Sequence, residues 1–500
     1  MIALAPVACE DTRAPAPWAW QQTSPEAQGM DSEQLAELLD QVVARDLHLH
    51  SLLVVRHDAI VLDANLFPYA GDRPHDVASC TKSLTSLAVG LAIDDGALSG
   101  VDEGLLSELP AQPASDPDGR KAAITLADAL SMTAGFDCVA SPEQTLMAML
   151  ESDDYTQFTV DLPMASDPGT TWNYCSPVSH LLSAVVGTAT GVASDAWLRA
   201  RLFDPIGVGE VPWPRDAQGV SHGWGDARLM PRDLARIGVL LLHGGRWDDA
   251  PVLDPAWIAD STAVRIAETG NGVGYGYHWW VAPDRGVYFA NGRGGQNLFV
   301  APELDAVVVT TGSGDPASAG AIADVLAELL IPAIVADEAV PERPDASARL
   351  ADAVARVGQA PASGPVDAVP AIARVLSGRT LVAQDNPLGW SAFALEFADD
   401  TAMLTIEIDG QRSHAAIGLD RRPRITHPVR FTADPRHAEA AVALLGRWLD
   451  ETTLQVEFDT IETIDAGTLT LGFFEGGVVV ALHERTFLDA TLFFSAEVAP

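Results

Sequence analysis

Residues 75–94 read HDVASCTKSLTSLAVGLAID, and this stretch places a Ser-x-x-Lys sequence, Ser79 to Lys82, at the start of an apolar helical pattern. Its leucines recur three and four residues apart, which puts them on one helix face. A serine and a lysine three residues apart project from the same side of a helix, one turn apart. Ser79 and Lys82 can therefore meet, and a neighbouring base is what a weakly nucleophilic hydroxyl requires.

The scarcity of lysine gives this spacing weight. The 500-residue chain contains two lysines, Lys82 and Lys121, and 27 serines. A chance Ser-x-x-Lys pairing is therefore expected roughly 0.1 times. At a helix N-terminus, Ser79 also lies near unpaired N–H groups and the positive end of the helix dipole, which favour negative charge on an attacked carbonyl oxygen. We interpret Ser79 as a nucleophile and Lys82 as its activating partner.

Composition excludes several classes of partner. With 69 acidic and 30 basic residues, the net charge is −39, which repels nucleic acid and anionic lipid. No uninterrupted apolar run approaches the roughly 18 residues of a membrane span. His48 and His50 have no carboxylate or cysteine beside them in a metal-binding pattern, so neither a metal nor a cofactor is expected.

The cysteines and the N-terminus leave the compartment open. Four scattered cysteines are too few for a disulfide framework, and we expect Cys80 and Cys175 to be small buried groups. Residues 6–9, Pro-Val-Ala-Cys, are loosely like a lipoprotein processing site that ends at Cys9. The chain is therefore either cytoplasmic or exported with a truncated signal.

The chain divides into four predicted parts: a flexible tail (1–20), a main domain (21–335), a linker with room for a short helix (336–365) and a β-rich C-terminal domain (366–500). In the main domain, strands at both ends of a mostly helical segment imply an α+β fold, in which an antiparallel sheet is flanked by helices and a helical region is inserted. Helices are expected at 31–43, 79–94, 125–132, 179–188, 195–203, 231–242 and 319–330, and strands at 51–56, 60–65, 287–290, 297–301 and 306–310. In the C-terminal domain, strands are expected at 391–397, 402–408, 454–458, 468–474 and 477–482, with a helix at 437–449.

Several separate motifs of the main domain resemble, in the same order, those of the serine β-lactamase and penicillin-binding-protein superfamily. The resemblance is to its class C-like branch, which includes esterases, D-amino-acid peptidases and 6-aminohexanoate-dimer hydrolases, and it covers roughly residues 18–332. The motifs are His75 to Ser83, Leu130 to Gly135, Pro168-Gly169-Thr170 leading to Tyr174-Cys175-Ser176, Leu229 to Leu234, Tyr275 to Trp280 and Gly292-Arg293-Gly294-Gly295-Gln296. The resemblance implies a β-lactamase-like fold.

The resemblance also implies site residues. Tyr174 would shuttle the proton of the nucleophile, and the backbone N–H groups of Ser79 and Arg293 would form the oxyanion hole. Glycines suit a place where substrate approaches the backbone closely, although a bulge or tight turn explains them equally well. The remaining expected substrate contacts are Ser176, His222, Trp224, Trp279, Gly292 and Gly294. Of the adjacent Trp279 and Trp280, one is expected in the core and one against substrate; the pattern does not decide which, and we assign Trp279 to substrate.

The chain departs from the family in one respect, because the basic Lys-Thr-Gly element is replaced by the glycine-rich segment. This puts recognition of a β-lactam carboxylate in doubt, although Arg293 could supply part of that charge. A rival nucleophile, Ser221 in Gly219-Val220-Ser221-His222-Gly223, matches a Gly-x-Ser-x-Gly elbow. It lacks the strand before it and the helix after it that the elbow needs.

These observations predict a serine hydrolase that cleaves a small-molecule ester or amide through an acyl-enzyme. A β-lactamase or D-amino-acid peptidase, and a sensor or pseudoenzyme that binds without turnover, remain as alternatives. The sequence allows a homodimer but does not decide the oligomeric state.

Overall fold

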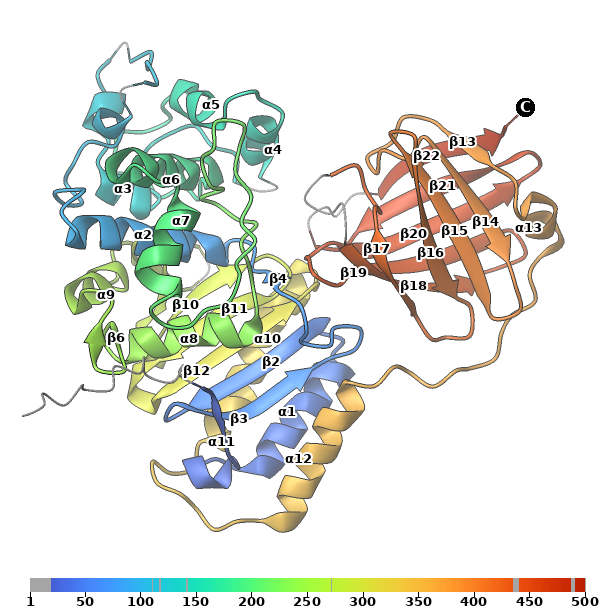
Figure 1. Cartoon of the computed structure of the whole chain (residues 1–500), viewed down its shortest axis with the longest axis horizontal. Helices are drawn as coiled ribbons and strands as arrows, with labels where there is room; N and C mark the ends of the chain where they lie inside the picture. The colour runs from blue at the N-terminus through green and yellow to red at the C-terminus, as the bar shows by residue number, and fades with distance from the viewer. Residues whose placement is uncertain are drawn as a thin grey trace, which may run out of the picture.

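The computed structural model describes residues 19–109, 111–116, 118–140, 143–270, 272–434, 440–486 and 491–499. The tail with Cys9 therefore lies largely outside the described residues. The main domain is built on an eight-stranded sheet with the order β1-β3-β2-β12-β11-β10-β9-β8 (Figure 1). The pairs are antiparallel except β1 with β3. The strands are β1 (Gln21–Gln22), β2 (Leu49–Arg56), β3 (Ala59–Asn65), β8 (Gly274–Tyr275), β9 (Trp280–Ala282), β10 (Val287–Gly292), β11 (Gln296–Ala301) and β12 (Ala306–Gly312).

A helical region inserted between β3 and β8 covers one face of this sheet (Figure 1). At its centre, α2 (Cys80–Asp94) is buried from Cys80 to Ala92 and packs against α6 (Ser176–Thr190) and β10. A helix with apolar residues on every side is stable only inside a core, and this one crosses the largest hydrophobic cluster of the molecule. The other elements here are β4 (His75–Asp76), η2 (Leu105–Glu108), η3 (Lys121–Ala123), α3 (Leu126–Leu130), α4 (Gln144–Leu150), α5 (Tyr155–Asp161), α7 (Ser194–Leu198), η4 (Arg199–Phe203), β5 (Arg228–Leu229), α8 (Pro231–Leu242), β6 (Arg246–Trp247), β7 (Ala250–Pro251) and α9 (Pro255–Ser261).

The terminal helices of the main domain cover part of the opposite sheet face. The helix α1 (Ser32–Ala44) packs against α10 (Pro316–Val325), η7 (Leu326–Leu330) and α11 (Ile331–Ala333). By length and composition alone, the continuous stretch Pro316–Ala333 could cross a membrane, with a mean hydropathy of 1.3. Its packing on α1 assigns it to this domain. The remaining short 3-10 helices are η1 (Glu26–Gln28), η5 (Pro283–Arg285) and η6 (Pro302–Leu304).

The C-terminal domain is a β-barrel of ten strands with the order β16-β15-β14-β13-β22-β21-β20-β19-β18-β17. A bridge between β16 and β18 closes the sheet on itself, and its interior holds a separate hydrophobic core (Figure 1). The elements are α13 (Ala371–Leu376), β13 (Leu381–Ala383), β14 (Ala392–Phe397), β15 (Thr401–Ile408), β16 (Gln411–Gly418), β17 (Arg424–Val429), β18 (Ala440–Trp448), β19 (Thr453–Thr460), β20 (Ala466–Phe474), β21 (Gly477–Glu484) and β22 (Thr491–Val498).

Two expectations from the sequence differ from this structure. The helix predicted at 437–449 is wrong, because residues 440–448 form strand β18 between β17 and β19. Within the predicted linker, α12 (Pro344–Val357) is a full helix that packs against α1 and buries Leu350 and Ala353. The segment 344–357 therefore belongs to the packed main domain rather than to a free linker.

Candidate active site

Ser79 and Lys82 meet at the N-terminus of α2. The Lys82 Nζ donates to the Ser79 Oγ at 2.8 Å and to the Trp224 carbonyl oxygen at 2.9 Å. Lys82 is 2% exposed, so these oxygens rather than bulk water surround its Nζ. Ser79 is the N-cap residue, and the Lys82 N–H donates to its carbonyl oxygen at 3.0 Å. When the amine is neutral, the same contact lets the Ser79 hydroxyl give its proton to the Nζ.

The backbone before Ser79 lies against the glycine-rich turn between β10 and β11. A Cβ placed on Gly292 would lie 2.5 Å from the Val77 carbonyl oxygen and 3.0 Å from the Ala78 Cβ, so only glycine allows this approach. Ala78 has a φ of +46°, a strained value for a residue with a side chain. The Asp76 Oδ1 accepts from the Ala78 N–H at 2.7 Å and stabilises this turn. Arg293, the expected second oxyanion donor, follows Gly292 directly.

Tyr174 precedes α6 and lies beside the lysine. The Lys82 Nζ is 4.8 Å from the centroid of the Tyr174 ring. The Tyr174 ring stacks on Trp280, with centroids 6.1 Å apart, and meets Tyr275 edge-on. Burial raises the pKa of Tyr275 well above its ordinary value, so that residue stays a neutral phenol. Tyr174 is thus the phenol of this cluster whose ring contacts the lysine.

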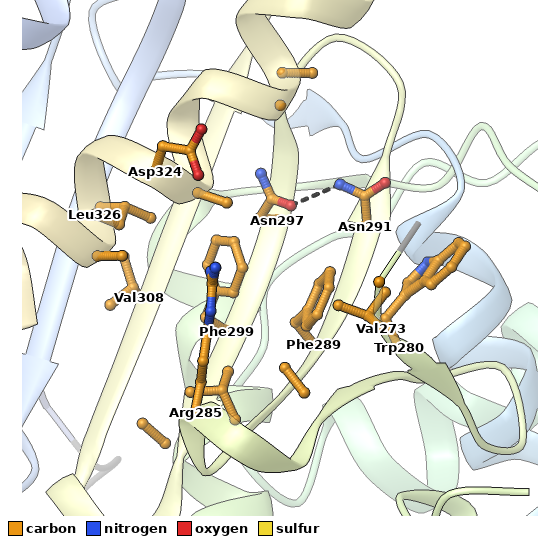
Figure 2. A pocket seen from close by; sticks show the side chains of 18 of the residues that line it. Val273, Trp280, Arg285, Phe289, Asn291, Asn297, Phe299, Val308, Asp324 and Leu326 are labelled. Atoms are coloured by element: carbon orange, nitrogen blue, oxygen red, sulfur yellow. Dashed lines mark hydrogen bonds between the residues drawn. The ribbon is translucent and has the colours of Figure 1, made fainter. Parts of the chain in front are cut away.

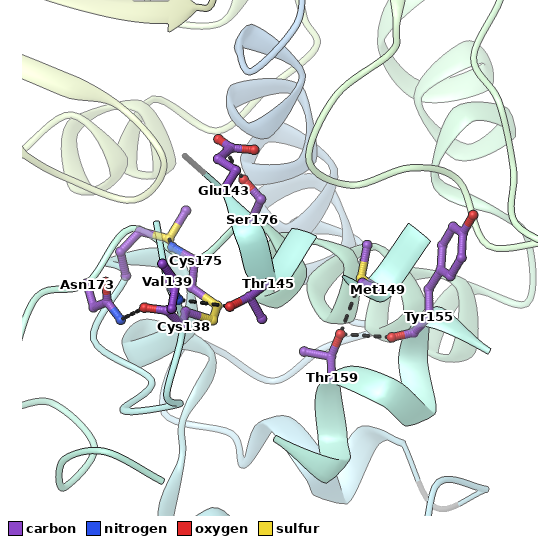
Figure 3. Close-up of a disulfide and its surroundings, with 11 residues drawn as sticks. Cys138, Val139, Glu143, Thr145, Met149, Tyr155, Thr159, Asn173, Cys175 and Ser176 are labelled. Carbon is purple, nitrogen blue, oxygen red and sulfur yellow. Dashed lines mark hydrogen bonds between the residues drawn. A yellow bond between two sulfur atoms is a disulfide. The ribbon is translucent and has the colours of Figure 1, made fainter. Parts of the chain in front are cut away.

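A disulfide between Cys138 and Cys175 anchors the segment that carries Tyr174 (Figure 3). It joins residues 37 positions apart, with Cα atoms 5.7 Å apart. Cys175 was expected to be a small buried group; it is buried, but as half of a disulfide. No motif indicated the pairing, because the fold alone brings the two residues together. Among the described residues, Cys80 is a buried free cysteine.

The segment around His222 and Trp224 supports the lysine from the other side. The two rings stack at 4.2 Å, and the His222 Nδ1 lies 2.7 Å from the Asp226 carboxylate. Both side chains are nearly buried, at 5% and 4% exposure. Trp224 therefore acts on the site through its carbonyl oxygen, which accepts from Lys82.

His278 is hydrogen-bonded to the first turn of α2. Its Nδ1 donates to the Lys82 carbonyl oxygen at 3.1 Å, and its own carbonyl oxygen accepts from the Ser83 Oγ at 2.6 Å. Burial, together with the charge of Lys82, lowers the pKa of His278 to about 3. His278 is therefore neutral and does not compete with Lys82 for the proton. Sequence reasoning missed this residue, although it stands within the quoted Tyr275 to Trp280 motif.

The assignment of Trp279 to substrate is wrong. Its side chain is 1% exposed and packs edge-on against Tyr288 in the core. Adjacent side chains point to opposite faces of a strand, so its neighbour Trp280 is the one that faces the Tyr174 ring.

The remaining predicted residues lie as follows. Ser176 is buried at the start of α6, and its Oγ donates to Glu143 at 3.4 Å. Gly294 has a φ of +84°, which favours glycine. Ser221 is fully buried and donates to the Asp195 carboxylate at 2.7 Å, so its hydroxyl is committed to a structural contact.

The C-terminal barrel touches the same turns. The Glu462 carbonyl oxygen accepts from the Asp76 N–H at 2.9 Å, three residues before Ser79. The Arg293 Nη1 donates to the Thr486 Oγ1 at 2.8 Å. Both segments that carry the expected oxyanion donors are therefore hydrogen-bonded to the barrel.

No group of three or more His, Cys, Asp or Glu residues suited to a metal ion is found within the described part of the chain. His50 instead lies between the two domains, with its Nδ1 2.8 Å from the His75 Nε2 and its Nε2 3.0 Å from the Asp459 carboxylate.

Comparison with known proteins agrees with this arrangement. Residues 35–331, more than half of the chain, match the family described as Beta-lactamase. The chain belongs to the beta-lactamase family. As expected from the motifs, it falls in the serine β-lactamase and penicillin-binding-protein superfamily.

The individual relatives of this chain have low sequence identity to it. It is 26% identical over 283 residues to the 6-aminohexanoate-dimer hydrolase of Paenarthrobacter ureafaciens, which covers 53% of this chain and 72% of the relative. A solved 6-aminohexanoate-dimer hydrolase candidate from Bacillus anthracis has a TM-score of 0.55 at 18% identity, covering 65% of this chain and 89% of that one. A penicillin-binding protein homologue from Pyrococcus abyssi has a TM-score of 0.49 at 14% identity and covers 93% of this chain and 99% of that one. Membership of a hydrolase superfamily supports an enzyme.

Proposed function

We propose that this protein is a serine hydrolase that cleaves a small-molecule ester or amide through an acyl-enzyme on Ser79. The observation that supports it most is the 2.8 Å contact between the Lys82 Nζ and the Ser79 Oγ at a helix N-terminus. A buried lysine aimed at a serine hydroxyl has little structural purpose, since the same helix start could be capped without burying an ionisable group.

The reaction follows from this geometry. The Ser79 Oγ forms a bond to the substrate carbonyl carbon while its proton passes to the Lys82 and Tyr174 pair. The N–H groups of Ser79 and Arg293 stabilise the oxyanion, and the alcohol or amine leaves with the transferred proton. Water then attacks the acyl-enzyme, which releases the acid and restores the serine.

Ester or amide cleavage is preferred over β-lactam cleavage for one reason. The glycine-rich turn carries Arg293 in place of the basic Lys-Thr-Gly element, and the Arg293 guanidinium is engaged with Thr486 rather than extended freely toward a ligand carboxylate. The 26% identity to a 6-aminohexanoate-dimer hydrolase supports the amide alternative within the same mechanism.

The test is covalent labelling followed by intact-mass spectrometry. A fluorophosphonate probe is expected to add one label to the wild-type protein and to Ser221→Ala, and none to Ser79→Ala. Label on Ser79→Ala would disprove the nucleophile. Turnover of p-nitrophenyl butyrate but not of nitrocefin is expected; stable acylation without turnover would instead favour a sensor.

A further inference from the structure

A mostly apolar groove of about 1210 Å³ lies between the strands β9 to β12 of the main sheet and the helix α10 (Figure 2). Its floor is a row of side chains on four adjacent strands: Trp280, Phe289, Phe299 and Val308. Trp280 pairs with Phe289, Phe289 with Phe299, and Phe299 with Val308, so all four lie on one face. The ring centroids are 6.4 Å apart for the first pair and 5.2 Å for the second.

The opposite wall of the groove is mostly apolar but also carries the exposed Asp324 (Figure 2). It is formed by α10 and η7 and includes Ala323, Leu326 and Leu330. In the continuous helical stretch Pro316–Ala333, only 28% of the residues are buried, although its mean hydropathy is 1.3. One side of this helix packs on α1, and the other leaves apolar surface open to the groove. A ligand between the aromatic row and this helix would release water from apolar surface on both sides.

One end of the groove lies beside the segment that carries Arg293, the expected oxyanion donor. Gly292, Arg293 and Trp280 line its near end. Trp280 stacks on Tyr174, whose ring lies 4.8 Å from the Lys82 Nζ. The aromatic surface thus extends without a break from the lysine to Phe299.

Polarity along the groove matches a substrate with one polar end. Asn291 and Asn297 lie at the end near the glycine-rich turn, where the Asn291 Nδ2 donates to the Asn297 Oδ1 at 2.8 Å (Figure 2). These amides place polar groups at the end of the groove where the ester group would lie. Beyond them the floor is aromatic and aliphatic, and the exposed Arg285 side chain also lines the groove (Figure 2).

The length of this row of four side chains indicates how long a bound alkyl chain can be. Three steps between neighbouring strands span about 14 Å. An extended chain advances about 1.2 Å per bond, so the row matches roughly ten to twelve bonds.

We propose that this groove binds the acyl chain of the substrate and makes the enzyme selective for neutral esters of medium-chain acids. This rests on the proposed function at Ser79. The polar ester group lies at the glycine-rich turn, and the chain extends over Phe289 and Phe299 under the wall of α10.

The first test is a chain-length series of p-nitrophenyl esters from acetate to laurate. Each buried methylene should raise kcat/KM by about two- to fourfold until the groove is filled. The ratio of kcat/KM for decanoate to that for butyrate should fall at least tenfold in Phe299→Ala, which removes the floor, and in Ala323→Glu, which puts a charge in the wall. Phe493→Ala is the matched control, because Phe493 is 71% exposed on the barrel. It should leave the ratio unchanged.

Two outcomes of this series would overturn the proposal. One is a wild-type kcat/KM that declines beyond butyrate. The other is a fall in Phe299→Ala and Ala323→Glu that is equal for butyrate and decanoate. Sizing by light scattering adds a third: a wild-type dimer that Ala323→Glu converts to a monomer would show that a second copy covers the groove.

A binding measurement on a variant that cannot form the acyl-enzyme separates this proposal from the proposed function. In the Ser79→Ala protein, 1-octanol should change the tryptophan fluorescence, and Ala323→Glu should abolish that change. If no ester acylates Ser79 but 1-octanol binds in this way, the proposed function fails and the groove assignment stands. If esters are hydrolysed but 1-octanol does not bind, the groove assignment alone fails.

Discussion

Lys82 has contacts that a lysine held only for structure would not need. Its Nζ donates to the Ser79 hydroxyl and to the backbone carbonyl oxygen of Trp224. The chain contains a natural comparison in its other lysine. Lys121 is also buried, and its Nζ donates to the Val160 carbonyl oxygen at 2.7 Å near the Phe136 ring. The two differ in that Lys82 faces a hydroxyl that can give up a proton.

This difference predicts the effect of Lys82→Arg. A guanidinium keeps the charge but cannot act as a base at working pH. The rate of Ser79 acylation should therefore fall by about 10²–10⁴-fold. Single-turnover labelling with p-nitrophenyl butyrate measures it directly.

Lys121→Arg is the matched control and should retain the wild-type rate, with melting temperatures recorded for both variants. Equal losses in the two variants would mean that Lys82 matters for packing alone. A wild-type rate in Lys82→Arg would remove it from the mechanism.

At the scale of elements, the sequence predicted what depends on local periodicity. The helix at 79–94, the hairpin strands of the main sheet and the glycine-rich turn all appear within a few residues of their expected bounds. Strand β18 was missed because it is covered on both faces. Val442 and Leu444 enter the barrel core, while Ala441 and Ala443 pack against Tyr69 of the main domain. A strand buried on both sides lacks alternation and is indistinguishable from an apolar helix by pattern.

The candidate site shows the same difference between local contacts, which the sequence predicted, and contacts between distant segments, which it did not. Ser79 and Lys82 are linked by one helical turn, so their meeting was readable from the sequence. The contact of Lys82 with Trp224, the stacking of Tyr174 on Trp280 and the pairing of the two cysteines join segments distant in the chain. Such contacts follow from the tertiary fold, which residue spacing does not encode.

The disulfide between Cys138 and Cys175 carries a prediction at this scale. A bridge across 37 residues restricts the unfolded chain and typically stabilises a fold by about 2–4 kcal/mol. Because Cys175 follows Tyr174, its loss should also loosen the tyrosine. We expect Cys138→Ser with Cys175→Ser to lower the melting temperature and to slow turnover of p-nitrophenyl butyrate.

Cys80→Ser is the control, since Cys80 is a free thiol. Reducing agent should reproduce the double variant in the wild-type protein and leave the double variant unchanged. An effect of reductant on the double variant would place the sensitive group elsewhere.

At the scale of the whole molecule, the barrel and the main domain share one buried polar contact zone. Asp459 of β19 accepts from Ser313 at 3.2 Å and lies 3.0 Å from the His50 Nε2. Burial, with the neighbouring His50, lowers the pKa of His75 to about 3, so this zone holds neutral His75 at working pH. Next to it, the Arg73 guanidinium donates to the Glu462 carboxylate at 2.5 Å. The docking of the barrel thus rests on polar pairs that lose their partners if the domains part.

The hydrogen bonds continue from this zone to the turn before Ser79, the proposed nucleophile. The Glu462 carbonyl oxygen accepts from the Asp76 N–H, and the Asp76 carboxylate accepts from the Ala78 N–H. Ala78 holds its positive φ directly before Ser79. A barrel that docks less firmly should therefore relax the strained turn.

Asp459→Asn tests this coupling. An amide keeps the shape of the side chain but removes the negative charge that faces His50. We expect kcat to fall for butyrate and decanoate alike, with faster amide hydrogen exchange at residues 75–79 and an unchanged barrel core. Asp450→Asn changes an exposed loop carboxylate that accepts from Thr452 within the barrel. This variant should change neither kcat nor the amide exchange at residues 75–79. If Asp459→Asn speeds exchange at 75–79 without lowering kcat, the turn before Ser79 does not depend on the barrel for its catalytic geometry.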